Sequence, residues 1–232
     1  MSETLSAVAA ALTAEQRALL CQRWTHAALA EHASVASFSR FALHLLAVGA
    51  PPLLVADAHR AALDEIEHAK LCFGLASVYA GEALGPGPLP LEGDLLGELS
   101  LAAITAAAVA EGCVGETVAA LEASAAAERT RIPEVRSALE TISADEAQHA
   151  QLAWRFVRWA LGQPDPAVRP AVSAAFRQAL AVQVEIPAPE ADDALLEAHG
   201  RLGGASLRRC QQAALREVVG PAAEVLLSGY SA

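Results

Sequence analysis

The chain has 232 residues, enough for one large domain or two small ones, and its formal net charge is −11 at pH 7. That charge argues against a nucleic-acid partner, which needs a basic face, and against binding to an anionic membrane surface. Apolar residues make up 54 % of the chain and aromatic residues only 4 %. Alanine, the strongest helix former, is by far the commonest residue, so helix is the expected structure throughout.

Four cysteines stand apart from one another in the sequence: Cys21, Cys72, Cys113 and Cys210. None belongs to a C-x-x-C pair, which excludes a rubredoxin-type iron site and a zinc ribbon and indicates a reducing compartment. The N-terminus lacks the basic segment of a signal peptide. The longest apolar run, residues 99–110, is too short to span a bilayer. These features predict a cytoplasmic protein without a membrane partner.

Two long helices are predicted in the first third of the chain. Residues 13–16, T-A-E-Q, form a capping-box sequence that opens the first helix. Residues 49–52, G-A-P-P, end that helix and place a proline at the start of the second, which Gly81 closes.

A proline- and glycine-rich stretch, residues 82–93, separates this pair from a second pair of helices. Twelve extended residues reach roughly 40 Å, about the length of a 28-residue helix, so the stretch can cross the full length of a bundle. Asp94 is expected to cap the third helix. Pro133 is expected to begin the fourth, which Gly162 and Pro164 end.

The chain therefore contains a twofold repeat, with residues 13–81 matching residues 94–162. We predict a four-helix bundle over residues 1–162 and a C-terminal helical extension over residues 163–232. The extension carries no chemical motif, and its expected role is packing on the bundle or contact between two copies in a homodimer.

Residues 64–68 and 145–149 both read D-E-x-x-H. On a helix, positions i and i+3 share a face, so the glutamate and histidine of each motif can bind one metal ion together. A further glutamate lies one helix earlier in each repeat. The candidate ligands are Glu31, Glu65, His68, Glu111, Glu146 and His149.

A single E-x-x-H pair is usually a pair of surface residues, and a single buried histidine is usually an ordinary core residue. Here all six side chains fall on the apolar stripes of four long helices, and no lysine or arginine accompanies them there. Burying four carboxylates without partners would cost several kcal/mol each. Either the carboxylates are protonated or two divalent cations neutralise them, and the second interpretation is favoured. Carboxylate with imidazole suits iron or manganese.

In these motifs and their spacing, residues 13–162 resemble the ferritin-like di-iron carboxylate superfamily, which includes bacterioferritin, rubrerythrin, manganese catalase, the small subunit of ribonucleotide reductase and bacterial multicomponent monooxygenases. The resemblance implies an all-α, ferritin-like four-helix bundle with one long crossover. It also implies two iron ions, with two manganese ions or a mixed pair as alternatives. Glu65 and Glu146 would then bridge the ions, with Glu31 and Glu111 as terminal ligands.

The aspartate before each glutamate is similar to that of the reductase and the monooxygenases. By that resemblance Asp64 orients His149 and Asp145 orients His68, because a ligating imidazole needs an acceptor for its other N–H. The alternative is that both are ordinary surface acids.

Cys72 follows His68 by one helical turn, and Gly115 follows Glu111 by one turn. Both are small, and a glycine inside a helix costs roughly 1 kcal/mol relative to alanine. The sequence therefore predicts a substrate pocket beside the metals at these two residues. The alternatives are an apolar filler at Cys72 and close helix packing at Gly115.

The predicted function is oxidation of a small organic substrate by O₂, with electrons from an external donor. Alternatives are ferroxidase activity with iron storage, and peroxide disposal like that of manganese catalase. The sequence does not name the substrate.

Overall fold

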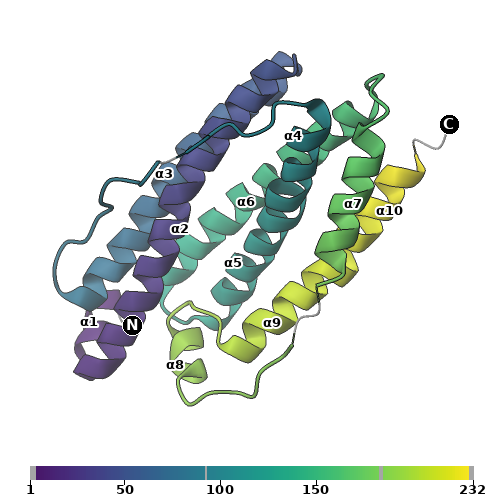
Figure 1. Cartoon of the computed structure of the whole chain (residues 1–232). Helices are drawn as coiled ribbons and strands as arrows, with labels where there is room; N and C mark the ends of the chain where they lie inside the picture. The colour runs from purple at the N-terminus through teal and green to yellow at the C-terminus, as the bar shows by residue number, and fades with distance from the viewer. Residues whose placement is uncertain (1–3, 92, 183–184, 230–232) are drawn as a thin grey trace.

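The computed structural model describes residues 4–91, 93–182 and 185–229. Within those residues the chain is helical and contains no strand. Four long helical segments lie side by side, and shorter helices from the C-terminal part pack along one flank (Figure 1).

The first pair of helices is α2 (Ala14–Ala47) and α3 (Pro52–Ala80), which pack along their length. The capping box at the start of α2 is confirmed: the Thr13 side chain accepts from the Gln16 amide, and the Gln16 side chain accepts from the Thr13 amide. Gly81 ends α3 with a φ of 76°, a left-handed conformation that suits glycine. The short helix α1 (Leu5–Ala10) precedes this pair and contacts α3 and α6.

After α3 the chain returns along the length of the bundle, with no helix or strand in its described residues, and enters α4 at the far end (Figure 1). The third helix begins later than predicted. Asp94 does not cap it; its carboxylate accepts from the amides of Leu96 and Gly97 in a local turn. The cap is Ser100, whose hydroxyl accepts from the amide of Ala103. The serine therefore provides the acceptor for the free amides of the first turn.

The third segment is one continuous run made of α4 (Leu101–Ala108), the π-helix η1 (Val109–Glu116) and α5 (Thr117–Arg129). The fourth is α6 (Pro133–Leu161), which begins at the predicted proline and ends against Gly162. Because of the crossover, α3 and the α4–α5 run point the same way (Figure 1).

The C-terminal helices are α7 (Val168–Leu180), α8 (Asp193–Ala198), α9 (Gly204–Ala213), η2 (Ala214–Val219) and α10 (Gly220–Ser228). Helix α7 packs on α4 and η1, and α9 packs on α5. Val172 and Phe176 of α7 are buried in the same apolar cluster as Phe156 of α6. These helices therefore share a core with the bundle.

Two apolar clusters divide the interior. One contains Trp24, Tyr79 and Ile142, and the other contains Phe38 and Phe156. On α2, α3 and α6, the candidate ligands lie between residues of one cluster and residues of the other; they are Glu31, Glu65, His68, Glu146 and His149. The site therefore forms a polar layer across the middle of an otherwise apolar bundle.

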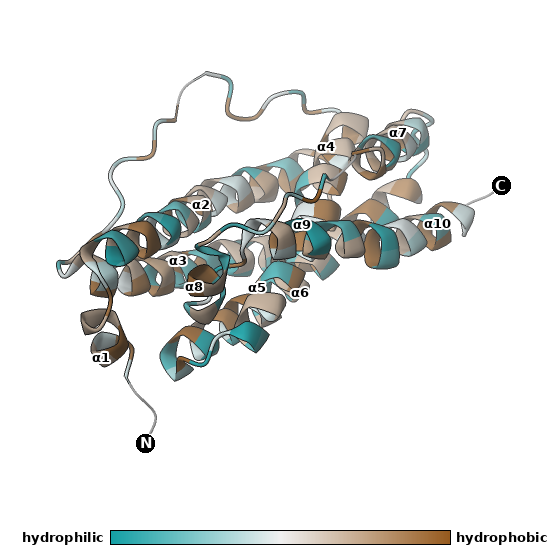
Figure 2. Ribbon diagram, turned by 90° about the horizontal axis from the view of Figure 1, so that it is seen from below, coloured by the Kyte–Doolittle hydropathy of each residue, from teal (hydrophilic) through white to brown (hydrophobic). Residues whose placement is uncertain are grey.

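By length and composition alone, the run Leu101–Arg129 could cross a membrane; its most apolar window has a mean hydropathy of 1.4 and is 33 % buried. Figure 2 shows α4 mostly in the brown shades of apolar residues. The core helix of a soluble protein satisfies the same criteria, so one such run is weak evidence for a membrane span. A cytoplasmic location without a membrane partner stays a prediction.

Candidate metal centre

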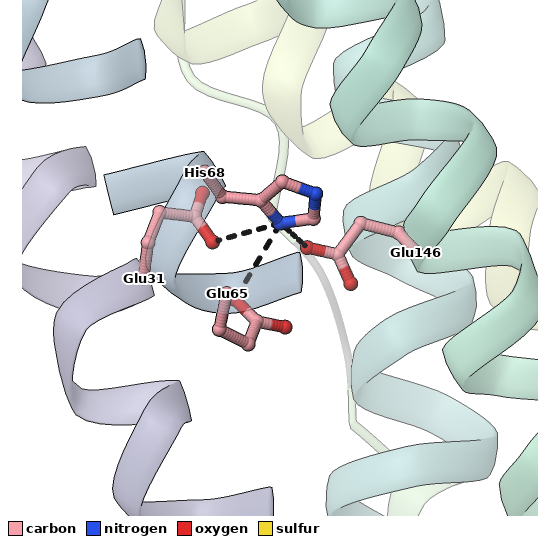
Figure 3. Close-up of side chains that lie close together, drawn as sticks. All are labelled: Glu31, Glu65, His68 and Glu146. Carbon is pink, nitrogen blue, oxygen red and sulfur yellow. Dashed lines mark ion pairs between the residues drawn. The ribbon is translucent and has the colours of Figure 1, made fainter. Parts of the chain in front are cut away.

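Six side chains from the four long segments meet in the polar layer. They form two groups, in each of which one ligand atom per residue lies within 4.8 Å of the others. The first group is Glu31, Glu65, His68 and Glu146, and the second is Glu65, Glu116, Glu146 and His149. Glu65 and Glu146 belong to both groups, as expected for carboxylates that bridge two ions. Figure 3 shows the first group, with the three carboxylates around the imidazole of His68.

Both imidazoles turn Nδ1 toward the carboxylates. Nδ1 of His68 lies 3.5 Å from oxygens of Glu65 and Glu146 and 3.9 Å from Glu31. Nδ1 of His149 lies 3.2 Å from Glu65 and 3.3 Å from Glu146. Each nitrogen therefore points into a space enclosed by carboxylate oxygens.

Three atoms at the centre of this layer are buried without a hydrogen-bond partner: both carboxylate oxygens of Glu65, and Nδ1 of His68. Glu65 is only 1 % exposed. Leaving such groups unpaired costs free energy that a bound cation would remove. The donor set, carboxylate oxygens with imidazole nitrogens, is also one that iron and manganese accept. The two groups could therefore hold metal ions.

The Nε2 atom of each histidine meets an aspartate from the opposite repeat. Nε2 of His68 lies 3.2 Å from Asp145, and Nε2 of His149 lies 3.3 Å from Asp64. The pairing is the one that the resemblance implied. An Nε2–H donated to the aspartate leaves the lone pair of Nδ1 free to face a metal.

If the two aspartates orient the histidines, Asp64→Ala and Asp145→Ala should each weaken metal binding about 10–100-fold. Isothermal titration with Mn(II) measures the change. Asp57→Ala is the matched control, since Asp57 lies on the same face of α3 but pairs with Arg60 and Arg155 instead of a histidine. Affinities that match the unmodified protein in both aspartate variants would mean that these residues are ordinary surface acids.

Glu111 does not join the site, so its prediction as a ligand was wrong. Its side chain is 56 % exposed and pairs with Arg40 at 2.7 Å. Glu116, which the sequence analysis missed, takes the fourth carboxylate position.

The π-helix explains the exchange of Glu116 for Glu111. Its hydrogen bonds run from i to i+5, so each residue turns less far around the axis than in an α-helix. The buried face passes through Ala108, Cys113 and Thr117, whereas a regular α-helix would have brought Glu111 inward. The signal in the sequence was the pair Gly112 and Gly115, unusual inside an alanine-rich helix.

The same rotation moves Gly115 to the surface, so it does not lie beside the metals as predicted. Its neighbour Gly112 is the residue that requires a glycine. A Cβ atom at Gly112 would overlap the Cβ of Ala153, whereas one at Gly115 would meet only the carbonyl oxygen of Ala110, at 3.5 Å. Gly112 thus allows η1 to approach α6 closely and brings Glu116 within reach of Glu146.

Gly112→Ala should therefore destabilise the protein by about 1–3 kcal/mol, through overpacking against Ala153. Gly74→Ala, in the middle of α3 with open space around it, should instead stabilise by about 0.5–1 kcal/mol. Urea denaturation of the metal-free proteins gives both values. Equal effects in the two variants would contradict close packing at Gly112.

In the metal-free protein, the buried carboxylates and imidazoles of the two groups shift one another's pKa values. Burial and the charges of Glu146 and Glu65 raise the pKa of Glu31 to about 8, and burial together with Glu146 raises that of Glu116 well above its usual value. Burial alone lowers the pKa of His68 and His149, but the carboxylates of Glu146 and Glu65 outweigh it. The pKa values rise to about 11 and about 10. Glu116 and both imidazoles hold the pKa of Glu146 well below its usual value against the effect of burial.

Metal ligands must be deprotonated, so binding of two divalent ions at pH 7 should release about three to four protons. Because protons compete below these raised pKa values, metal affinity should increase as the pH rises from 6 to 8. Titration calorimetry in buffers of different ionisation enthalpy counts the protons. An affinity that does not change with pH would contradict the displacement of protons by metal.

Three openings reach the polar layer or its aspartates. The largest, of about 580 Å³, is an open, polar hollow lined by Asp64, Asp145 and His149. A cavity of about 270 Å³ includes Glu31, Glu146 and Cys72 in its wall. That Cys72 lines a substrate pocket stays a prediction. A smaller pocket of about 50 Å³ reaches Glu116 and His149 on the other side, with Gly112 in its wall. Burial raises the pKa of the Cys72 thiol to about 12, so it is a neutral, weakly polar wall residue.

Comparison of the chain with models of protein families, with curated proteins and with solved structures finds no match.

Proposed function

We propose that this chain is a ferritin-like di-iron carboxylate protein that uses O₂ to oxidise a small organic substrate. Support comes from the polar layer across four long helices, the two carboxylates shared between the two groups, and the crossed aspartate–histidine pairs. The long connection between α3 and α4 also fits the ferritin-like arrangement.

Glu31 and His68 would hold one ion, Glu116 and His149 the other, and Glu65 and Glu146 would lie between them. Bound iron would supply the reductive activation of O₂. The protein's own residues orient the imidazoles through the aspartates and keep bulk water away, since His68 is fully buried and His149 is 3 % exposed. The remaining electrons for oxygenation would come from an external donor.

The observation that favours an oxidase over the alternatives is the cavity of about 270 Å³, whose wall contains the ligands Glu31 and Glu146. Its remaining wall is mostly apolar, as in sites for organic ligands. Neither ferroxidase activity nor peroxide disposal requires an apolar cavity of this size, because iron ions, O₂ and peroxide are small and polar or diatomic.

The test begins with metal analysis of protein loaded with Fe(II) without oxygen, where two ions per chain are expected. O₂ is then added, and absorbance scans follow the oxidation of Fe(II). About as much Fe(II) as the sites bind should be oxidised, and no more. Continued oxidation of excess Fe(II) into a large mineral core would establish storage instead. Vigorous O₂ release from peroxide by the manganese-loaded protein would establish catalase activity.

A further inference from the structure

The C-terminal part of the chain contributes to the wall of the cavity beside Glu31. Helix α2 packs along α3, and α5 packs along α6, while the cavity lies between α2 and α5. Residues 200–202, between α8 and α9, belong to its wall. The wall of the cavity therefore combines residues of the four long segments with residues of the C-terminal extension. Figure 1 shows α9 beside α5.

Arg201 brings a positive charge to this wall. Among the lining residues that the structure describes it is the one lysine or arginine. Its guanidinium lies over the ring of Trp24, 5.2 Å from the centroid, a stacking contact that holds the side chain in place. Within the described part of the chain, its guanidinium makes no hydrogen bond or ion pair, unlike Arg40 in the wall of the smallest opening, which pairs with Glu111.

The turn that carries Arg201 is held in one conformation by its backbone and its contacts. Gly200 has a φ of 79°, and a Cβ there would overlap Val135. The backbone N–H of Arg201 donates to the carbonyl of Leu196 at 2.8 Å. The main-chain carbonyl of His199 accepts from the indole of Trp24. These contacts fix the turn against the bundle and direct the position of the guanidinium.

The nearby carboxylates of Glu122 and Glu31 attract this charge from a distance, but among the described residues neither forms an ion pair with it. Glu122 accepts a hydrogen bond at 2.8 Å from Gln211, and Glu31 faces His68 in the metal layer. Burial lowers the pKa of Arg201, and the attraction of Cys72, Glu122 and Glu31 offsets that effect only in part. A guanidinium nevertheless stays protonated in proteins, so an anionic partner would stabilise it.

We propose that the cavity takes a small monocarboxylic acid with an apolar body, whose carboxylate pairs with Arg201 and whose carbon chain extends toward Glu31 and Glu146. The apolar part of the wall, which includes Ile142, Leu139 and Leu207, fits an aliphatic chain. A doubly charged phosphate fits less well, because one guanidinium faces three lining glutamates. Only the fate of the acid, its oxidation at the metals, rests on the proposed function.

Octanoate is the probe. Its binding to the full chain is followed by titration calorimetry and by tryptophan fluorescence, since Trp24 lines the cavity. Binding is measured without metal and again after loading with Mn(II). Octanoate should bind the parent protein, and Arg201→Gln should weaken binding at least tenfold, while Arg201→Lys retains part of it. Octanol, which has the same chain without the charge, should bind equally to the parent and to Arg201→Gln.

Two further variants separate the cavity from general effects. Arg216→Gln removes an exposed arginine that pairs with Glu217 and should leave octanoate binding unchanged. Ala119→Phe adds bulk to the wall from α5 and should block octanoate without a change of charge. Far-UV circular dichroism and thermal unfolding check that each variant folds.

Octanoate affinity that is equal in the parent and in Arg201→Gln, or no binding to the parent, would overturn the assignment of the cavity. Metal content and O₂ uptake are recorded on the same samples. Metal binding without Arg201-dependent octanoate binding would therefore contradict this inference alone. Octanoate binding through Arg201 in a protein that takes up no metal would contradict the proposed function alone.

Discussion

Glu116→Ala should reduce the metal content from two ions per chain to about one and abolish the reaction of the Fe(II) protein with O₂. Glu116 is the carboxylate that belongs to the second group only, together with His149. Without Glu116 the second group keeps one imidazole and the two shared carboxylates. It loses the one carboxylate that it does not share with the first group. The first site keeps all four of its ligands. Elemental analysis after reconstitution and removal of free metal gives the stoichiometry.

Glu111→Ala is the matched control for this prediction. Glu111 belongs to the same helical run and is the residue that a regular helix would place in the site, but its side chain is exposed and paired with Arg40. It should retain two ions and full reactivity. Loss of an ion in Glu111→Ala with full occupancy in Glu116→Ala would mean that the run is a regular α-helix in the loaded protein.

Metal loading should raise the thermal unfolding temperature by about 15–30 °C. At free metal a thousandfold above the dissociation constant, each ion adds about 4 kcal/mol, so two ions add about 8 kcal/mol. For a chain of this size, 1 kcal/mol corresponds to about 2–4 °C. The layer crosses all four long segments, so its ligands are assembled only in the folded chain. A chelator should reverse the shift.

Glu65→Ala tests the source of that stabilisation. Glu65 contributes to both groups and is buried with no hydrogen-bond partner for either oxygen. Its removal should abolish binding of both ions and with it the metal-dependent rise, whereas Glu31→Ala should keep part of the rise. Calorimetric scans with and without Mn(II) measure each variant. A full rise in Glu65→Ala would place the stabilising ions elsewhere.

Most of the site could be read from the sequence, for a physical reason. Within a regular α-helix, residues i and i+3 share a face whatever the helix packs against, so each Glu–His pair was determined locally. The helix ends at Thr13, Gly81 and Pro133 also follow from local capping and backbone preferences. The wrong predictions concern the third helical segment. They are the ligand Glu111 and the pocket residue Gly115, which lie in the π-helix, and the cap Asp94, which lies in a local turn before the helix.

The tertiary structure alone decided which glutamate of the third segment turns inward. A π-helix is locally less favourable than an α-helix, so tertiary packing must stabilise it. The close approach of Gly112 to Ala153 and the burial of Cys113 favour the π form here. That choice rotates Glu116 in and both Glu111 and Gly115 out. The place of Arg201 was equally hidden, because it depends on how a distant segment packs against Trp24. The spacing of residues along one helix is a local property. Which side chains an irregular helix or a distant turn directs into a site depends on how the core packs.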